Sequence, residues 1–222
     1  MKLERRDQVV VITMQRTENR FNPEHLAELE DAFDQVAAME GRPAAVLTGE
    51  DKFFSNGLDL EWMGSVDPAD AKESVERTMR LFARILTSPF GIVAAINGHC
   101  FAAGAMMALA CDARVMRSDR GFFCLPEVDI YMQFTPGMRS LITAKLDAST
   151  AHESMLSGRR YGGEEAASRG IVDAAVAEDE VLPAAIERAK LFAGKDPATV
   201  AGIKSGVYGA IVDDLHLPLF GT

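Results

Sequence analysis

Cysteine and histidine are scarce in this sequence. The three cysteines, Cys100, Cys111 and Cys124, are an odd number and lie within or beside apolar runs, which argues against a disulfide framework and for a reducing compartment. The four histidines form no pair at i and i+4 and have no Cys-x-x-Cys companion, so the usual spacing of a zinc site is missing. We therefore expect no disulfide and no bound metal ion.

Long apolar runs are missing too. A helix needs about 18 to 20 apolar residues to span a bilayer, and the longest candidate, residues 92–110, is interrupted by Asn97, Gly98, His99 and Gly104. The first residues, MKLERRD, have no apolar signal core behind them. The sequence thus predicts a protein without a membrane segment that stays in the cytoplasm.

Basic side chains are fewer than acidic ones. The chain has 23 Lys and Arg against 33 Asp and Glu, and its net charge of −10 repels phosphate backbones and anionic lipid. Binding to nucleic acid or to a membrane surface is therefore disfavoured. With 222 residues, 48% of them hydrophobic and 25% charged, the sequence is typical of one globular domain or of one domain with an appendage.

Strands alternate with helices through the first half of the chain. β-Branched and apolar runs predict the strands, and an apolar residue at every third or fourth position predicts the helices. Asn22 before Pro23 is typical of an N-cap. Strands are expected at residues 9–14, 44–49, 92–96, 113–116 and 121–124, and helices from 23 to near 41, at 69–86 and at 102–110, the last buried on all sides.

This alternation predicts an α/β fold built of βαβ units, followed by a mostly helical extension. From Pro136 onward we expect helices broken at glycines and prolines, among them Gly158 and Pro183. The predicted division is a core over residues 1–173 and a C-terminal helical region over 174–222.

Two segments have the same design, in which a buried strand leads into a glycine-containing turn and then a helix. They are residues 53–60 (FFSNGLDL) and 97–106 (NGHCFAAGAM). The first N–H groups of a helix have no partner inside it, so two such turns that converge would form an oxyanion hole. The alternative is that the glycines only allow the chain to turn after each strand and have no catalytic role. The second segment matches neither a dinucleotide fingerprint nor a phosphate loop.

Glu127 is the carboxylate most suited to proton transfer. It lies in the apolar segment FFCLPEVDI, where desolvation would raise its pKa toward neutrality. The alternative is a carboxylate at a loop rim, paired with an arginine or a backbone amide. Asp112 and Asp129 are better explained by bonds to backbone N–H groups.

A catalytic triad of Ser55, His99 and Asp129 has little support, because no Gly-x-Ser-x-Gly elbow is present. His25 falls in the helix that follows Asn22. We expect it on that helix's surface.

Three motifs together resemble a known family. Residues 53–60, residues 96–112 (INGHCFAAGAMMALACD) and residues 125–130 (LPEVDI) resemble, in this order and spacing, the crotonase or enoyl-CoA hydratase/isomerase superfamily. Among its members, the motifs are most similar to those of the Δ3-Δ2-enoyl-CoA isomerases. The likeness runs from the first expected strand to about Asp173, and three separated motifs make it specific.

The resemblance implies a crotonase-like spiral of ββα turns with two roughly perpendicular sheets, and a helical C-terminal region used in trimerisation. The protein would then be a homotrimer or a dimer of trimers. It would act on an acyl-CoA thioester and need no separate cofactor, since coenzyme A is part of the substrate.

The resemblance also implies roles for individual residues. The backbone N–H groups of Leu58 and Ala103 would form the oxyanion hole, and Glu127 would carry the proton. Ala102 and Ala103 stand where the family often has glycine. The residues expected along the substrate path are Arg20, Phe21, Ser55, Asn56, Gly57, Asp59, Leu60, Gly98, Phe101, Gly104, Met106 and Pro126.

Met106 decides the expected subclass. Hydratases of this family use two acids, and Met106 stands where the first would be, beside Phe101 and Met132 in a dry wall. A single base suffices to move a double bond, so the resemblance favours an isomerase of 3-enoyl-CoA. Three alternatives stay open: a hydratase or a thioester hydrolase in which Asp129 supplies the missing acid, and a non-catalytic member that binds CoA or a partner protein.

Overall fold

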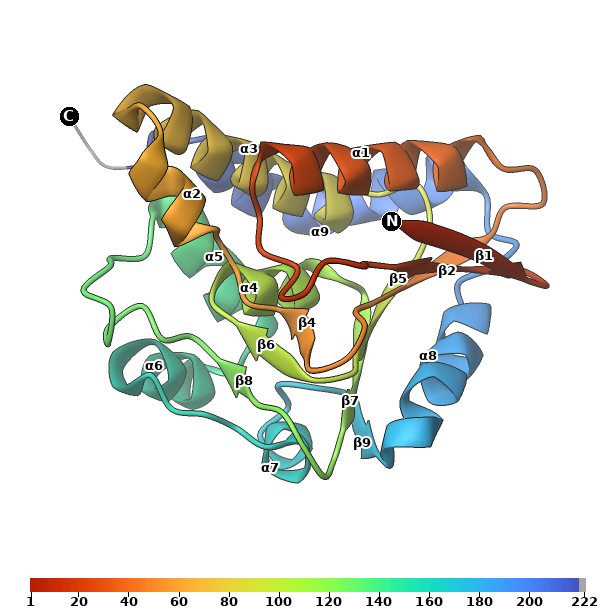
Figure 1. Ribbon diagram of the computed structural model, residues 1–222. Helices are drawn as coiled ribbons and strands as arrows, with labels where there is room; N and C mark the ends of the chain where they lie inside the picture. The colour runs from red at the N-terminus through yellow and green to blue at the C-terminus, as the bar shows by residue number, and fades with distance from the viewer. Residues whose placement is uncertain (220–222) are drawn as a thin grey trace.

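The computed structural model describes residues 1–219, which form two β-sheets surrounded by helices (Figure 1). Within the larger sheet every pairing is parallel except that of its first two strands. Its strand order is β1 (Lys2–Arg6), β2 (Val9–Thr13), β3 (Ala44–Thr48), β5 (Ile92–Ile96), β7 (Ala113–Arg117) and β9 (Ala174–Val176). The smaller sheet is parallel and consists of β4 (Phe53–Ser55), β6 (His99–Phe101) and β8 (Phe123–Cys124).

The chain visits the two sheets in turn. Strands β3, β5 and β7 belong to the larger sheet, and each is followed by one strand of the smaller sheet and then by helix. The helices that close these three turns are α2 (Leu60–Ser65) with α3 (Pro68–Leu86), α4 (Ala103–Ala110) and α5 (Pro136–Lys145). The expected spiral of ββα turns is therefore confirmed.

The larger sheet is covered on both faces. Along β2, Val9 and Val11 pack with α8 (Val181–Lys190), whereas Val10 and Ile12 face the main core, as the two-residue period of a strand requires. The main core also receives α1 (Pro23–Ala38), α3 and α4. All eight residues of α4 are buried, as expected.

The remaining helices follow the core. They are α6 (Ala148–Ser157), α7 (Gly163–Ser168), a 3₁₀ turn at Glu178–Glu180, and α9 (Pro197–Leu215). Helix α9 is tied to the sheet by Lys204, whose ammonium lies 2.7 Å from the carboxylate of Asp112. The same carboxylate accepts a 2.7 Å hydrogen bond from the Ile92 N–H, which confirms a structural role for Asp112. No helix within residues 1–219 is long and apolar enough to cross a membrane.

Several predicted elements need correction. Strand β1 was not expected because its sequence, KLERR, is charged, but it lies at a sheet edge, where charged side chains are tolerated. Pro183 does not break a helix, because it lies in the first turn of α8, where its missing N–H costs nothing. Strand β9 continues the sheet past residue 173, although the division of the chain at that point stays a prediction.

His25 is not on a helix surface, contrary to expectation. Its side chain is fully buried in the core and its ring is stacked on Phe21 at a centroid distance of 6.0 Å. Within residues 1–219 neither ring nitrogen has a hydrogen-bond partner. Burial, followed by the charge of Arg16, lowers the pKa of His25 to about 4, so the ring packs as a neutral aromatic group.

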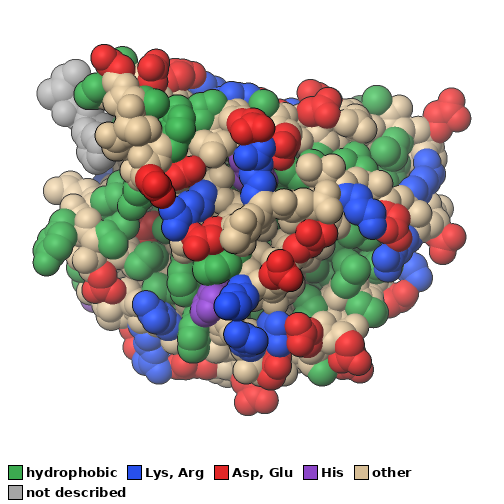
Figure 2. All heavy atoms as spheres, viewed as in Figure 1, with side chains coloured by type: hydrophobic (Ala, Val, Ile, Leu, Met, Phe, Trp, Pro, Cys, Tyr) green, Lys and Arg blue, Asp and Glu red, His purple; other side chains and the backbone are tan. Residues whose placement is uncertain are grey.

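Charged side chains are mixed on the surface. On the face shown in Figure 2, basic side chains lie among acidic ones, and no continuous basic stripe crosses this face of the described residues. A nucleic-acid interface normally requires such a stripe.

Candidate active site

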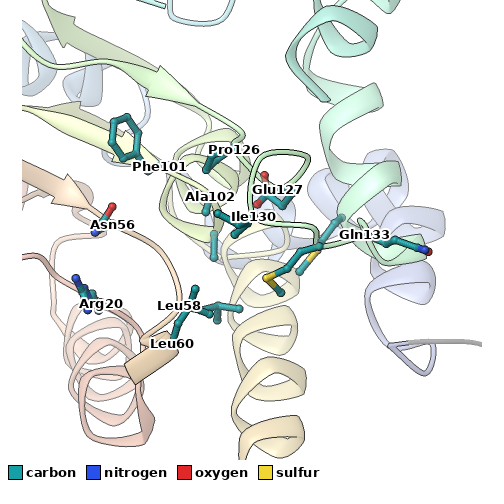
Figure 3. Close-up of a pocket in the computed structure, with 13 residues that line it drawn as sticks. Arg20, Asn56, Leu58, Leu60, Phe101, Ala102, Pro126, Glu127, Ile130 and Gln133 are labelled. Carbon is teal, nitrogen blue, oxygen red and sulfur yellow. The ribbon is translucent and has the colours of Figure 1, made fainter. Parts of the chain in front are cut away.

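One pocket brings the two predicted turns and Glu127 together. It has a volume of about 220 Å³ and lies between the turns that follow β4 and β6 and the segment that follows β8 (Figure 3). Its wall is formed by Arg20, Asn56, Leu58, Leu60, Phe101, Ala102, Ala103, Pro126, Glu127, Ile130, Met132, Gln133 and Met138.

The first turn leaves the Leu58 amide free. Gly57 has a φ of +81°, a conformation that glycine adopts without strain. The Phe21 N–H donates to the Gly57 carbonyl at 2.7 Å, and the Asp59 N–H donates to the Phe21 carbonyl at 3.0 Å. These two bonds fix the residues on either side of Leu58, whose own N–H has no acceptor within residues 1–219.

The second turn presents the Ala103 amide in the same way. Ala103 is the first residue of α4, so its N–H has no partner inside the helix, and none elsewhere in the described part of the chain. The preceding residue, Ala102, has φ +51° and ψ −126° and makes no side-chain cap. The two turns are in contact, because a Cβ atom on Gly57 would lie 3.0 Å from the Ala103 nitrogen.

Buried residues hold the two turns in place. The Ser55 hydroxyl donates to the Asn19 carbonyl at 2.7 Å and accepts from the Gly57 N–H at 3.2 Å. Gly104 packs directly on Ser55, since a Cβ atom on Gly104 would lie 2.6 Å from the Ser55 carbonyl oxygen. Ser55, Phe21 and Gly104 therefore support the turns from behind, and none of them lines the pocket.

Glu127 lines the same pocket as this pair of amides and comes from the segment after β8. Its side chain is only 5% exposed, and its Oε2 atom has no hydrogen-bond partner within residues 1–219. Burial raises the pKa of Glu127 to about 7, as the sequence predicted. Glu127 is therefore not a rim carboxylate paired with an arginine, although a hydrogen bond from its own backbone N–H lowers its pKa in part.

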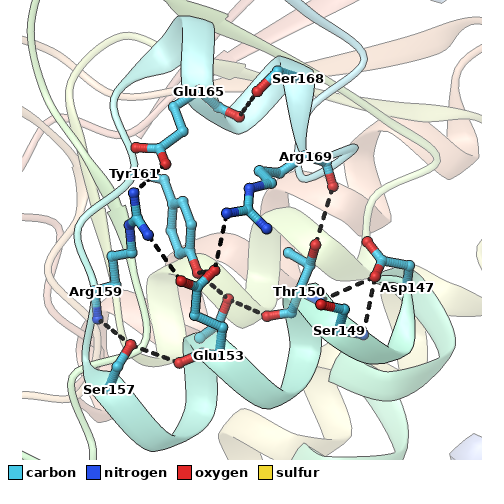
Figure 4. A network of polar contacts seen from close by, with 11 residues as sticks. Asp147, Ser149, Thr150, Glu153, Ser157, Arg159, Tyr161, Glu165, Ser168 and Arg169 are labelled. Carbon is cyan, nitrogen blue, oxygen red and sulfur yellow. Dashed lines mark hydrogen bonds and ion pairs between the residues drawn. The ribbon is translucent and has the colours of Figure 1, made fainter.

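A polar network anchors the strand that leads to Glu127 (Figure 4). Tyr161 and Phe123 of β8 exchange two backbone hydrogen bonds of 2.9 Å. The buried Tyr161 hydroxyl donates to the Glu153 carboxylate at 3.1 Å and lies 3.3 Å from the Ser154 hydroxyl. Arg159 pairs with Glu153 at 2.8 Å. Helix α6 and the segment that follows it thus hold β8 in position.

The end of the pocket nearest Arg20 is polar. Glu18 accepts a hydrogen bond of 2.6 Å from Arg20 and one of 2.8 Å from Asn56, and these contacts lower the pKa of Glu18, with the Asn56 bond the largest cause. One carboxylate therefore joins the two polar residues of the wall. The opposite end is apolar apart from Gln133.

Eight of the predicted site residues line the pocket: Arg20, Asn56, Leu58, Leu60, Phe101, Ala103, Pro126 and Glu127. Three others lie elsewhere. Met106 is fully buried in the core of α4 and is not part of the dry wall. Gly98 lines a separate cavity with Lys52 and Arg120. Asp59 caps α2 by accepting the Trp62 N–H at 3.1 Å.

The structure does not assemble the other constellations. The Ser55 hydroxyl is bonded to Asn19 and not to His99, and within residues 1–219 the Nδ1 atom of His99 has no partner. Asp129 is exposed beside Gly158. In the described part of the chain, no group of three or more His, Cys, Asp or Glu side chains is arranged to hold a metal ion.

Sequence reasoning missed several wall residues. The motifs mark Ala102 only as a departure from glycine and do not predict Ile130, Gln133 and Met138 as lining residues. Ile130 ends the LPEVDI motif, so the apolar residues after Glu127 were the available signal. Nothing in the sequence marked Glu18 as the link between Arg20 and Asn56.

Comparisons with known proteins show the family of this chain. Residues 4–216 match the model of a family described as enoyl-CoA hydratase/isomerase. Over 227 aligned positions the chain is 34% identical to the peroxisomal enoyl-CoA delta isomerase 2 of Arabidopsis thaliana, covering 97% of this chain and 95% of that protein. The cytoplasmic location of this chain stays a prediction.

Solved structures share the fold. Human mitochondrial delta3-delta2-enoyl-CoA isomerase superposes with a TM-score of 0.89 at 26% identity, covering 96% of this chain and 85% of that one. A probable enoyl-CoA hydratase of Mycobacterium tuberculosis superposes with a TM-score of 0.90 at 25% identity, covering 98% and 92%. The crotonase-like fold predicted from the three motifs is thereby confirmed.

Proposed function

The chain belongs to the enoyl-CoA hydratase/isomerase family, and we propose that it isomerises 3-enoyl-CoA to trans-2-enoyl-CoA with Glu127 as the one side chain that carries the proton. The make-up of the pocket wall is the observation that carries this proposal. Among its lining residues, all within the described range 1–219, Glu127 is the only carboxylate and Arg20 is the only other ionisable side chain.

One base is enough for this reaction. The Glu127 carboxylate takes a proton from C2, and the electron pair of that C–H bond moves into the thioester carbonyl, giving a dienolate with a negatively charged oxygen. The same proton then returns at C4 as the carbonyl re-forms, which leaves the double bond between C2 and C3. The reaction consumes no water and no second reactant.

The free amides of Leu58 and Ala103 suit the dienolate oxygen. Two N–H groups fixed by the fold stabilise the negatively charged oxygen of the dienolate more than the neutral carbonyl of the bound substrate. They therefore lower the activation barrier of proton transfer. Loss of one such donor typically costs about 2.7 to 4 kcal/mol of barrier. The apolar wall keeps water away from the intermediate.

A pKa of about 7 for Glu127 fits a group that must both take and return a proton. A carboxylate with an ordinary pKa would be a weak base toward C2, whereas one near neutrality binds the proton more strongly and still ionises at physiological pH. Burial without an ion-pair partner is the physical cause.

Hydration has less support in this pocket. Orienting a water molecule while protonating C2 is work that two carboxylates usually share. Met106, at the position of the first of the two acids in the family's hydratases, lies in the core. Asp129 is exposed and is not part of the pocket wall, so it is a poor substitute.

Two parallel assays test the proposal. We expect isomerisation of 3-hexenoyl-CoA to exceed hydration of crotonyl-CoA, and a hydration rate above the isomerisation rate would overturn the assignment. Glu127→Gln should retain CoA affinity and lose several orders of magnitude in kcat, whereas Glu61→Gln, an exposed carboxylate of α2, should behave as wild type. Unchanged turnover by Glu127→Gln would remove this residue from the mechanism.

The assembly and the cofactor requirement belong to the same proposal. We expect an acyl-CoA substrate with no additional cofactor, and a homotrimer or dimer of trimers. The exposed apolar residues Ile203 and Val207 on α9 support assembly through the C-terminal helices. Analytical ultracentrifugation would distinguish these states from a monomer.

A further inference from the structure

Phe21 holds both of the peptide groups that adjoin Leu58. The Leu58 N–H and the Gly57 carbonyl belong to one peptide group, and this carbonyl accepts the 2.7 Å hydrogen bond from the Phe21 N–H. A trans peptide group is planar, with its N–H pointing opposite to its C=O, and none of the described peptide bonds is cis. The bond from Phe21 therefore sets the direction of the Leu58 N–H. The next peptide group is fixed by the 3.0 Å bond from the Asp59 N–H to the Phe21 carbonyl.

The position of Phe21 depends in turn on the start of α1. Its ring is fully buried, stacked on His25 and in edge contact with Phe82 at a centroid distance of 6.4 Å. The next residue, Asn22, is the N-cap of α1, and its Oδ1 atom accepts the His25 N–H at 3.0 Å. The direction of the Leu58 N–H is thus tied to the N-terminus of α1.

The caps of α1 and α2 are bonded to each other. Asp59 is the N-cap of α2, and its Oδ1 atom accepts the Trp62 N–H at 3.1 Å. Its Oδ2 atom accepts a hydrogen bond of 3.1 Å from the Nδ2 atom of Asn22. Each of the two side chains uses one polar atom to cap its own helix and the other to bind its partner. Neither lines the pocket, whereas Leu58, directly before Asp59, does (Figure 3).

We propose that Asn22 and Asp59 are positioning residues for the oxyanion hole, and that the bond between these two caps keeps the Leu58 amide aimed at the thioester oxygen. This inference rests on the proposed isomerase function and adds to it two residues that do not touch the substrate. A donor must be fixed in advance to stabilise a developing charge. Loosening it therefore raises the energy of the transition state more than that of the bound substrate, so kcat should fall while KM changes little.

Exchanging the two side chains tests the proposal. Asn22→Asp keeps the cap of α1, because Asp and Asn are equally good caps, but it removes the donor and places a second carboxylate against Asp59. We expect kcat for 3-hexenoyl-CoA to fall by about tenfold or more, with KM within about twofold of wild type. Adding Asp59→Asn restores the bond with its direction reversed and keeps both caps and the net charge. The double variant should recover kcat to within about threefold of wild type.

Two further variants separate positioning from loss of stability. Asp67→Ala removes the exposed cap of α3, which accepts the Ala69 N–H at 3.0 Å. It should lower the midpoint of urea unfolding and leave kcat unchanged. Asn22→Ser retains one oxygen to cap α1 but has no second polar atom for Asp59. If Asn22→Asp does not fold, Asn22→Ser takes its place, and its kcat should fall with KM unchanged.

The outcomes for the positioning role differ from those for the isomerase function. If the folded Asn22 variant keeps wild-type kcat, or if the double variant is as slow as Asn22→Asp, the positioning role is wrong while the isomerase function stands. If no 3-enoyl-CoA is turned over, the isomerase function fails, and calorimetric binding then decides the positioning role.

The two ligands for that measurement differ in the charge on the thioester oxygen. Acetoacetyl-CoA ionises to an enolate that shares its negative charge with this oxygen, whereas butanoyl-CoA has a neutral carbonyl. We expect the preference for acetoacetyl-CoA over butanoyl-CoA to fall by about tenfold in Asn22→Asp and to return in the double variant. The same preference in wild type and both variants would overturn the positioning role.

Discussion

Gly57 and Ala102 lie against each other where the two turns of the pocket meet. A Cβ atom on Gly57 would come 2.9 Å from the Cβ atom of Ala102, so the two turns leave no room for a side chain at residue 57. Ala102 itself has φ +51° and ψ −126°, a conformation that L residues rarely adopt and glycine adopts freely. The contact brings the Leu58 and Ala103 amides together at the cost of backbone strain in Ala102.

Ala102→Gly should stabilise the protein. Strain of this kind costs about 1 to 3 kcal/mol, whereas the extra freedom that glycine gives the unfolded chain costs about 0.4 to 1 kcal/mol. We expect the free energy of unfolding in urea to rise by about 1 kcal/mol. Ala27→Gly, at an exposed position within α1, is the control and should lower it by about 1 kcal/mol. Equal losses in the two variants would show that Ala102 is not strained.

The elements of the site were predictable where one local pattern determined them. Glu127 lies in an apolar run, and burial of a carboxylate in such a run raises its pKa whatever the exact neighbours are. The two turns that precede α2 and α4 were predictable for a similar reason, since a helix that follows a strand begins with free N–H groups. The resemblance then indicated which two amides, those of Leu58 and Ala103, face one pocket.

Contacts between distant segments could not be predicted in this way. Glu18 joins Arg20 to Asn56, a residue 38 positions away, and no local pattern encodes that pairing. Met106 was expected beside Glu127, but only the first residue of α4 reaches the pocket, because the rest of the helix is surrounded by core. Ile130 and Met132 line the pocket because of the turn at Tyr131, whose positive φ has no signature in an aromatic residue.

The error at His25 came from residue type and not from periodicity. Four positions before Leu29, it lies on the same apolar stripe of α1 as Leu29 and Phe33, which a helical period of 3.6 residues requires. Residue type alone favours a surface position, because most histidines are at least partly exposed. The apolar stripe of α1 predicts the buried position of His25 correctly.

Activity should depend on the ionisation of Glu127. In the proposed mechanism the Glu127 carboxylate is the base. Burial raises its pKa to about 7, so the rate should rise with pH up to that value and stay level above it. The measurement is kcat for 3-hexenoyl-CoA from about pH 4 to about pH 9. An acid limb centred near the ordinary glutamate value of 4.5 would show that the side chain is solvated in the enzyme–substrate complex.

Stability should depend on pH through two buried groups that act in opposite directions. The pKa of His25 is lowered from 6.5 to about 4 on folding, so the unfolded chain binds more protons and the contribution of His25 is lost as pH falls from about 6.5 toward 4. The pKa of Glu127 is raised from 4.5 to about 7, so its contribution is lost as pH rises through that range. Each pKa shift corresponds to a change of about 3 kcal/mol in the free energy of unfolding. Between pH 4.5 and 6.5 the gain in stability from one group largely cancels the loss from the other.

Single variants at these two residues should reveal the opposing slopes. His25→Leu keeps an apolar side chain in the core and removes the titrating ring, so its unfolding free energy relative to wild type should increase as the pH falls below about 6.5. Glu127→Gln should show the reverse trend, gaining relative to wild type as the pH rises toward about 7. Urea unfolding at a series of pH values measures both differences, and carboxylates common to all three proteins cancel. A difference that does not vary with pH in His25→Leu would mean that His25 is already solvated in the folded protein.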